Sequence, residues 1–413
     1  MAIVIPWDSW HEIFVRLPAK SLLRCRAVSK AWRAFIDDGC FVKAYTKRQL
    51  TPTTSKNVII HNSAGPPFHP FCSLNLDALN FHGSSLQTVA VTPLDSTQCD
   101  RLNFPVAACD GLMLIAPSKP EQKWQIRNPS TNESLDLPQP DSRRYAATGL
   151  GYDKSSDDYK AVVIDYHCRR PGDGESEVYV YRTQIYSLKS DSWRSIADFP
   201  GHSMWGPSGP GVYMCGSLNW VNFISRVQNY EMMIALDLGA ETYRELRVPN
   251  VRYRPKEMCQ NRYLDVLDSG RLIMTDHSFT YDNKLQNFDV WVMQDYEADD
   301  SWVRCYSVEG VFGVARNVYH GLRFVAFMAD KLQLLLQDGW GFYLHDVQTS
   351  SVRRLVIEGL SKILSDENRI HVILSAQVMP ESIFRLHDNC GVGGRKRIVV
   401  DKEESVQIMS KKE

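Results

Sequence analysis

A recurring unit of short strands occupies residues 57–380 and limits the folds that the chain can adopt. Runs of Val, Ile, Leu, Tyr and Trp alternate there with Gly, Asn, Asp and Ser, and long amphipathic helices are scarce. In each unit, two strands flank a Gly-Leu or Gly-x-Leu turn, and a further strand ends in a turn before a Trp, Tyr or Leu. Corresponding points, roughly 50 to 60 residues apart, are Asn128, Ser187, Asp237, Trp291 and Asp346. A four-stranded blade fits each interval, so the pattern predicts an all-β, β-propeller-like domain.

About five copies of the unit follow one another, within residues 109–138, 149–193, 215–249, 270–302 and 331–355. Gly in the turn permits a positive φ, and Asn or Asp followed by Ser or Thr stabilises a tight turn through side-chain hydrogen bonds. The Trp side chains that recur in strands are interpreted as core between neighbouring blades rather than as a ligand platform. These are Trp193, Trp220, Trp291 and Trp302.

Both ends of this region extend the pattern. Residues 57–94 include Asn57–Ile60 and Leu86–Val91, which are expected to form a degenerate first blade. Arg369–Val378 is expected to supply a late strand that helps to close the ring, because closure removes exposed sheet edges. Residues 390–413 are glycine-rich and then charged, which predicts a mobile tail.

A helical stretch, Ile5–Asp38, precedes the strand units. Ser9 followed by Glu12 fits a capping box, and apolar residues then recur at helical spacing until Pro18 stops the first helix. A second apolar series interrupted by Lys and Arg completes two or three short helices. So short a piece cannot bury both faces of its helices, and each large side chain left in water forgoes about 1.5 to 3 kcal/mol. Docking on a partner is therefore predicted; a helical cap packed on the following domain is the alternative.

This stretch contains Leu17-Pro18, Leu22-Leu23 and Val28-Ser29-Lys30 with Trp32-Arg33. In these residues it resembles the plant F-box. The resemblance implies that residues 1–48 form a small all-α F-box module, which docks on the Skp-type adaptor of an SCF ubiquitin ligase and, through it, on a cullin scaffold. The adaptor-binding residues that it implies are Leu17, Pro18, Leu22, Leu23, Val28 and Trp32.

The strand units contain the short motifs CDGLMLI, IRNPST, GLGYD with DDYK, SWR, GSLNW, and VWVM with SW. Through these motifs they resemble the kelch-like plant F-box associated domain over most of residues 105–357. Ala161 stands where the family often has Val, and the double glycine of true kelch repeats is missing. Together the two resemblances imply a multidomain chain that bridges the adaptor and a protein substrate, which is ubiquitinated and degraded by the proteasome.

Three segments read as loops outside the blades, namely Cys168–Glu177, Gly201–Gly211 and Val251–Asn261. Loops at one end of a propeller are where substrate recognition is expected. Their Arg, Tyr, Trp and Met side chains are of the types enriched at interface hot spots, and a plain solvated loop is the alternative for each. The candidate substrate-binding residues are Arg169, Arg170, Met204, Trp205, Arg252, Tyr253 and Arg254.

Composition argues against several other partners. The net charge of -1 and the 23% of charged residues give no electrostatic case for nucleic acid or for a membrane surface. No apolar run reaches the length of about 18 residues that a membrane span needs, and no secretory signal is indicated, so we expect a cytoplasmic and/or nuclear protein. The ten cysteines are scattered without a C-x-x-C pair, which predicts reduced, structural thiols and neither a metal nor a cofactor.

Catalytic motifs are also missing from the sequence, including a G-x-S-x-G elbow, a Walker loop and H-E-x-x-H. Carboxylates that could converge on a propeller channel as acid and base fall in the repeated turn words, which favours a structural role. They are Asp153, Asp157, Asp158 and Asp237. A non-catalytic substrate receptor is therefore the leading hypothesis. A non-degradative F-box scaffold protein and a propeller enzyme with a helical appendage are the alternatives.

Overall fold

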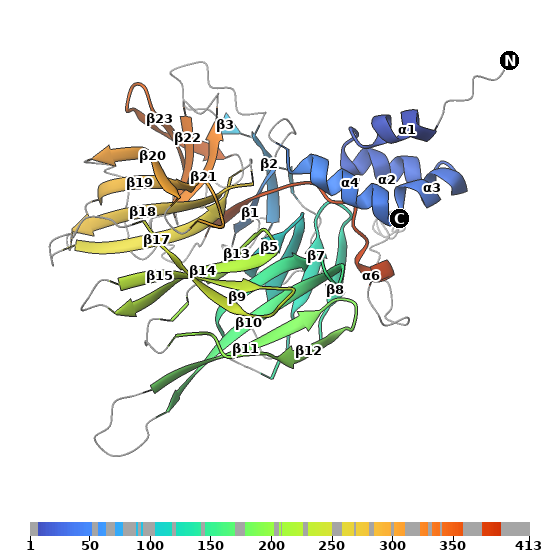
Figure 1. The fold of residues 1–413 in the computed structure, drawn as a ribbon. Helices are drawn as coiled ribbons and strands as arrows, with labels where there is room; N and C mark the ends of the chain where they lie inside the picture. Colours follow the sequence, from blue (N-terminus) through green and yellow to red (C-terminus); the bar gives the residue numbers. More distant parts are fainter. Residues whose placement is uncertain are drawn as a thin grey trace, which may run out of the picture.

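The computed structural model places a group of helices beside a larger β domain (Figure 1). It describes residues 7–51, 57–62, 71–76, 88–89, 92–93, 104–117, 121–141, 145–169, 178–201, 206–207, 209–225, 230–249, 258–267, 270–280, 285–298, 301–309, 323–328, 333–338, 341–357 and 374–389. The predicted mobile tail, residues 390–413, lies outside this part of the chain.

Four helices open the chain: α1 (Trp7–Phe14), α2 (Ala19–Arg26), α3 (Lys30–Ile36) and α4 (Gly39–Gln49). The predicted capping box at Ser9 is wrong, because α1 begins at Trp7 and already contains Ser9. Pro18 lies beyond the end of α1 and takes the N-cap position of α2 instead, with a φ of -58°. Proline suits this position because its ring fixes φ near -65° and it has no N–H that would need a partner.

In the described part of the β domain, the strands form five sheets: three of four strands, one of five and one of eight. The eight-stranded sheet is made of two four-stranded antiparallel units, which a short parallel pairing joins. Six four-stranded blades can therefore be distinguished among the described residues (Figure 1). Blade 1 consists of β25 (Leu374–Met379), β1 (Asn57–Asn62), β2 (Phe71–Asn75) and β4 (Thr92–Pro93).

Blades 2 to 6 follow in chain order. Blade 2 is β5 (Phe104–Cys109), β6 (Leu112–Ala116), β7 (Gln125–Asn128) and β8 (Glu133–Asp136). Blade 3 is β9 (Tyr145–Asp153), β10 (Asp158–Arg169), β11 (Val178–Ser187) and β12 (Ser192–Ser195). Blade 4 is β13 (Gly209–Met214), β14 (Ser217–Ser225), β15 (Tyr230–Asp237) and β16 (Tyr243–Arg247). Blade 5 is β17 (Met258–Val266), β18 (Leu272–Thr280), β19 (Leu285–Met293) and β20 (Trp302–Glu309). Blade 6 is β21 (Arg323–Met328), β22 (Gln333–Asp338), β23 (Gly341–Asp346) and β24 (Val352–Ile357).

The expected propeller-like, all-β domain is confirmed, since each of the five predicted copies coincides with one of blades 2 to 6. The late closing strand is also confirmed, because β25 pairs with β1 from Asn57↔Met379 to Asn62↔Leu374 and so joins the two ends of the domain. One expected strand lies elsewhere. Thr88 and Val89 form β3, which pairs in parallel with Val356 and Ile357 of β24, in blade 6 rather than in blade 1.

Tight turns join the first and second strands of several blades, as their sequences predicted. Asp110 and Gly111 have φ values of 50° and 80°, and Cys215 and Gly216 have values of 49° and 84°. Two successive residues with positive φ form the hairpin turn that matches the right-handed twist of the strands. Glycine tolerates this conformation because it has no Cβ, so the Gly-Leu and Gly-x-Leu words specify hairpins.

The core lies between the blades. Five apolar clusters each join two neighbouring blades, in sequence from blades 1 and 2 to blades 5 and 6. Trp220 is 1% exposed in the cluster between blades 3 and 4. Trp193, Trp291 and Trp302 are half-buried and pack against clusters of the same kind. The interpretation of these four residues as core is confirmed.

Trp220 occupies the contact between the first strands of blades 3 and 4. Its Nε1 donates a hydrogen bond to the Thr148 carbonyl at 3.1 Å. Gly211, in the parallel pairing of β13 with β9, lies so close that a Cβ added to it would come within 2.4 Å of the indole ring. The indole ring therefore fits only because position 211 has no side chain.

Gly211→Ala should accordingly lower the free energy of unfolding by about 1 to 3 kcal/mol, the usual cost of overpacking a core. The indole ring cannot swing away, since it is fully enclosed. Chemical denaturation followed by tryptophan fluorescence measures this loss. Gly39→Ala is the control, because nothing lies within 4 Å of a Cβ at Gly39 and alanine favours the helix that begins there. Equal stability of Gly211→Ala and the unmodified chain would contradict the close packing described here.

Candidate functional site

Helices α1 to α4, Trp7–Gln49, form a helical module with a core of its own. Its largest enclosed side chains, each at most 2% exposed, are Phe14, Leu22, Ile36, Phe41 and Tyr45. The Trp32 ring packs against those of Trp10 and Phe14, with centroids 4.9 and 5.0 Å apart. The Ser29 hydroxyl caps α3 by accepting from Trp32 N at 3.1 Å, and Asp38 caps α4. Caps and a ring cluster thus hold seven- to eleven-residue helices that would be marginal alone.

The six residues predicted to bind the adaptor have three kinds of environment. Leu22 is 0% exposed, so in this structure it holds α2 against the module core and offers no surface to a partner. Leu17 and Trp32 are half-buried and pack against the core of the module, and Leu23 is half-buried as well. Pro18 is exposed, and Val28 is 66% exposed in the turn between α2 and α3.

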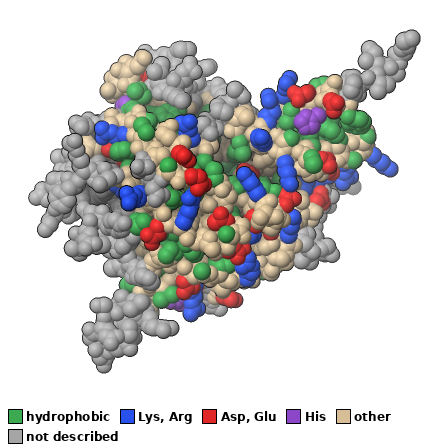
Figure 2. Space-filling view, viewed as in Figure 1, with side chains coloured by type: hydrophobic (Ala, Val, Ile, Leu, Met, Phe, Trp, Pro, Cys, Tyr) green, Lys and Arg blue, Asp and Glu red, His purple; other side chains and the backbone are tan. Residues whose placement is uncertain are grey.

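Exposed apolar side chains are concentrated on the helical module. Seven large ones are exposed among the described residues, and four of these belong to residues 7–50. They are Trp7 at 51%, Ile13 at 44%, Val28 at 66% and Leu50 at 47%. Figure 2 shows green apolar surface on the module at the upper right, between blue and red charged side chains. Trp7 and Leu50 were not singled out from sequence, where nothing local distinguishes them from core positions.

The module contacts the propeller through residues 380–389, which follow β25 and end in α6 (Leu386–Asn389). We name this segment the C-terminal bracket. Ile383 is 3% exposed and belongs to the apolar core of the module. The Glu381 carboxylate accepts from Ala19 N at 2.6 Å and from the Tyr45 hydroxyl at 3.3 Å. The core of the module is therefore completed by a segment more than 330 residues further along the chain.

The opposite side of the bracket lies on blade 2. Asn128 Nδ2 donates to the carbonyls of Ser382 and Phe384 at 3.1 and 2.9 Å. Arg385 forms an ion pair with Glu133, and both side chains are nearly enclosed. The other Glu133 oxygen accepts from Leu386 N at 3.0 Å.

A glycine of blade 2 allows the bracket to approach. A Cβ at Gly111 would come within 2.6 Å of Ser382 Cβ and 2.7 Å of the Pro380 carbonyl oxygen. The segments with the sequences CDGL and NPST were interpreted from sequence only as turns. They also form the surface on which the bracket packs. Asn128 shows both roles, because its Oδ1 accepts from Ser130 N at 2.9 Å while its Nδ2 holds the bracket.

The turns between the first and second strands of blades 2 to 5 lie on the side of the propeller next to the module, as far as the described residues show, and we call this side the near face. Asp157, in the turn between β9 and β10, forms an ion pair with Lys43 of α4 at 2.8 Å. A cleft of about 1070 Å³ lies between α4 and this face, bordered by Val42, Thr46, Tyr152 and Tyr213. The module therefore does not pack flat against the propeller.

The three segments predicted as substrate-binding loops adjoin the opposite ends of the strands, which form the far face. The chain leaves β10 at Arg169 and returns at Val178, at the end of β10 remote from the Asp157 turn. The second and third segments precede β13 and β17, whose other ends enter near-face turns. Of the candidate residues, Arg170, Met204, Trp205, Arg252, Tyr253 and Arg254 lie outside the described residues.

The limits of these loops differ from the prediction. Cys168 and Arg169 belong to β10 and pair with Tyr179 and Val178 of β11. Gly209–Gly211 pairs with Ala147–Gly149 of β9, and Met258–Asn261 belongs to β17. Gly, Pro and Arg residues in these words suggested loops, but backbone pairing with a neighbouring strand extends the strands through them.

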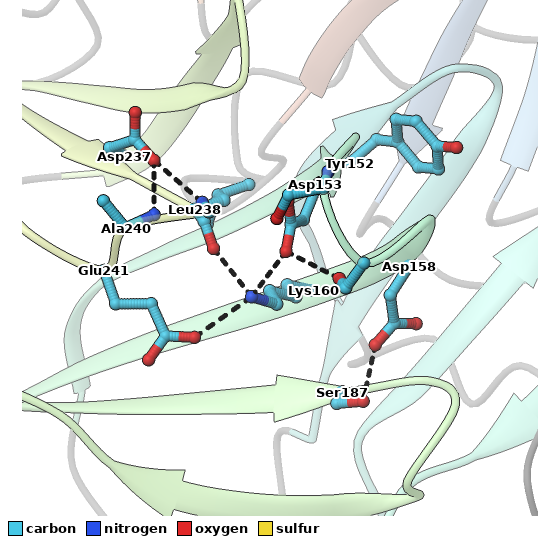
Figure 3. A network of polar contacts seen from close by, with 12 residues as sticks. Tyr152, Asp153, Asp158, Lys160, Ser187, Asp237, Leu238, Ala240 and Glu241 are labelled. Atoms are coloured by element: carbon cyan, nitrogen blue, oxygen red, sulfur yellow. Dashed lines mark hydrogen bonds and ion pairs between the residues drawn. The ribbon is translucent and has the colours of Figure 1, made fainter.

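A nearly enclosed lysine joins blades 3 and 4 on the near face (Figure 3). Lys160 Nζ lies 2.9 Å from Asp153, 3.0 Å from Glu241 and 2.7 Å from the Leu238 carbonyl oxygen. Glu241 also contacts Arg194. Burial alone would raise the pKa of Asp153, but hydrogen bonds from Ser156, Lys160 and Ser155 outweigh it and hold that pKa below its ordinary value.

The carboxylates considered as catalytic candidates each have a structural partner. Asp153 accepts from the Ser155 and Ser156 hydroxyls, Asp237 from Gly239 N and Ala240 N, and Asp158 from the Ser187 hydroxyl. Such contacts stabilise tight turns. Among the described residues, no group of three His, Cys, Asp or Glu side chains could hold a metal ion. Within the same residues, no helix is both long and apolar enough to cross a membrane.

Two family comparisons match this arrangement. Residues 4–43 match the F-box domain, and residues 69–336 match the F-box associated beta propeller domain. The second match covers more than half of the chain and includes strands from all six blades.

Relatives of similar length support these matches. The chain is 28% identical to the F-box protein CPR1 of Arabidopsis thaliana over 361 residues, which cover 81% of this chain and 79% of the relative. It is 27% identical to an F-box/kelch-repeat protein of the same plant, over 83% of this chain and 87% of that protein. The solved structure of an oligogalacturonate lyase in complex with manganese is 12% identical to this chain. The superposition covers 75% of this chain and 83% of the lyase, with a TM-score of 0.37, which is too low for a functional argument.

Proposed function

Because the chain belongs to the F-box proteins with an F-box associated β-propeller domain, we propose that it is the substrate-recognition subunit of an SCF-type ubiquitin ligase. The helical module docks on a Skp-type adaptor and, through it, on a cullin. The propeller holds a target protein, which is ubiquitinated and passed to the proteasome. The chain works in the cytoplasm and/or the nucleus and performs no chemistry itself.

The exposed apolar side chains of the module are the observation that carries this proposal. Val28 at 66% and Ile13 at 44% remain in water in the isolated chain, although the module has a core of its own. Covering a large apolar side chain gains about 1.5 to 3 kcal/mol, so a partner surface over several of them supplies a substantial binding energy. Pro18, Leu17, Leu23 and Trp32 adjoin the same helices and complete the proposed docking surface. Leu22 contributes by holding α2 in place.

Substrate binding is proposed for the far face, in the segments that contain Arg169, Arg170, Met204, Trp205, Arg252, Tyr253 and Arg254. The near face is occupied in part by the module and the bracket, through Lys43–Asp157 and the blade 2 contacts. A target on the far face leaves the adaptor surface free, so both can be bound at once. Proximity is then the mechanism, because holding the target beside the ubiquitin-conjugating enzyme raises its effective concentration there.

Co-purification tests this function. Tagged full-length chain and its Leu17→Ala/Pro18→Ala variant are isolated from proteasome-inhibited plant cells, and the bound proteins are identified by mass spectrometry. We expect adaptor and cullin to co-purify with the unmodified chain but not with the variant. We expect a further protein, the target, to co-purify with both chains and to be ubiquitinated only in the sample with the unmodified chain. Absence of adaptor and cullin from the unmodified sample would overturn the proposal. A bound protein that is neither ubiquitinated nor degraded would instead indicate a scaffold.

A further inference from the structure

Helix α2 follows Leu17-Pro18 and carries part of the proposed docking surface. No side chain at its own N-terminus caps it. Pro18 is the N-cap of α2 and makes no side-chain hydrogen bond there. The Glu381 carboxylate of the bracket takes that place by accepting from Ala19 N at 2.6 Å. A negative charge at a helix N-terminus is favourable because the peptide dipoles leave that end positive. The bracket thus caps a helix of the module from the far end of the chain.

Tyr45 joins the same point to α4. Its hydroxyl lies 3.1 Å from the Leu17 carbonyl oxygen and 3.3 Å from Glu381, and its side chain is 0% exposed. Burial and the charge of Glu381 both raise the pKa of Tyr45, so the hydroxyl keeps its proton and donates. Leu17, α4 and the bracket therefore meet around one fully enclosed hydroxyl.

The same ten residues are held on blades 2 and 3 by contacts that are mostly buried. Leu386 is 0% exposed in the cluster between blades 2 and 3, and Arg385 is 7% exposed beside Glu133. The Phe384 ring packs on that of Tyr159, with centroids 4.8 Å apart. Nearer the start of the bracket, the side chains of Glu381 and Ile383 contact the module instead. Each end of the bracket is thus anchored in a different core.

We propose that the C-terminal bracket fixes the direction of the helical module relative to the propeller, with Glu381 and Ile383 as its positioning residues. This inference rests on the proposed function, because a fixed direction matters when the module holds the adaptor and the far face holds the target. A single connection between α4 and β1 does not by itself fix an orientation, and the cleft beneath α4 leaves the module room to rotate. The bracket removes that freedom and keeps the target at a constant distance from the enzyme that modifies it.

The distance between two spin labels tests the bracket in the full-length chain. One label is placed on Cys40, which is exposed next to Gly39 of α4, and the other on Ser195→Cys, exposed at the end of β12. The other cysteines that react with the label, such as Cys168, Cys215 and Cys305, are replaced by Ser. Pulsed electron paramagnetic resonance then gives the distance distribution between module and propeller.

We expect one narrow distribution for the unmodified bracket and a distribution broader by about twofold or more for Glu381→Ala/Ile383→Ala. Glu381→Gln keeps the size and one acceptor oxygen, so it should broaden the distribution less and remains informative if the double variant fails to fold. Glu121→Ala, an exposed carboxylate away from the bracket, is the matched control. Circular dichroism confirms that each variant is folded.

An unchanged, narrow distance distribution in the folded double variant would overturn the proposal that the bracket fixes the direction of the module. If only Glu381→Gln folds, the same result in that variant would overturn it. Binding of a purified Skp-type adaptor to the unmodified chain is measured in parallel. Failure of the adaptor to bind, together with a broadened distribution in the variant, would count against the proposed function while supporting the bracket. The two ideas can therefore fail separately.

Discussion

Val28→Asp should weaken binding of a purified Skp-type adaptor to the full-length chain by about 100-fold or more. Val28 is 66% exposed in the turn between α2 and α3, on the proposed docking surface. An unpaired carboxylate placed there must lose its hydration when the partner covers it, and the apolar contact of the valine is lost as well. Each factor of ten in affinity corresponds to about 1.4 kcal/mol, so a penalty of about 3 kcal/mol accounts for the expected loss. Isothermal titration calorimetry measures it.

The chain offers a matched control in Val303, which is 51% exposed on β20 of the propeller. Val303→Asp makes the same chemical change at an exposed valine far from the helices, and adaptor affinity should stay within about twofold of the unmodified chain. Both variants should keep their unfolding temperature, because neither side chain is part of a core. Unchanged adaptor affinity of Val28→Asp would exclude Val28 from the docking surface. An equal loss with Val303→Asp would show that the effect is general.

The blades could be predicted from sequence because their determinants are local. A hairpin needs a turn word and two strands, and Asp110-Gly111-Leu112 contains the turn within three residues. The helical module was predictable for the same reason, since apolar spacing and Pro18 lie within one short stretch. Its exact boundaries were not, because Ser9 has the composition of a cap but lies inside α1. Packing of Trp7 on the Phe35 ring, with centroids 5.4 Å apart, extends that helix toward the N-terminus.

The bracket could not be predicted, because its contacts join residues about 250 to 360 positions apart. Nothing in the composition of residues 380–389 distinguishes them from an ordinary chain end. Glu133 and Asn128 supply the blade 2 side of these contacts, and both side chains are polar and buried. Buried polar side chains require partners, but sequence alone does not say which segment supplies them. The pairing of β3 with blade 6 escaped prediction for the same reason, because two residues carry no pattern.

Lys160→Met should lower the free energy of unfolding by about 3 kcal/mol, near the lower end of the cost of breaking a buried ion pair. Lys160 and Asp153 have side chains that are 9% and 3% exposed, so the remaining carboxylates would lie in a poorly hydrated site without their cation. The loss is not larger because Glu241 keeps Arg194, and Asp153 keeps the Ser155 and Ser156 hydroxyls. Denaturant unfolding near neutral pH measures it.

Lys154 provides the control, because it is exposed in the turn between β9 and β10. Lys154→Met should change the free energy of unfolding by less than about 0.5 kcal/mol.

The ion pairs also predict how the loss of stability in Lys160→Met varies with pH. Hydrogen bonds and ion pairs outweigh burial and hold the pKa values of Asp153 and Glu241 below their ordinary values in the folded chain. Their stabilisation is therefore complete above the unfolded pKa values of about 4 and is lost as the pH falls toward the lower folded values.

Lys160 sets the upper limit of the same pH window. Burial lowers its pKa, but Asp153 and Glu241 outweigh this effect and raise the pKa above its ordinary value. Its stabilisation is therefore present below the unfolded pKa of about 10.4 and is lost as the pH rises through the folded value. The deficit of Lys160→Met should be constant between about pH 5 and 10 and should shrink on either side. A deficit that stays constant down to pH 2 would mean that Lys160 stabilises blades 3 and 4 by packing of its methylene chain, and that the ion pairs contribute little.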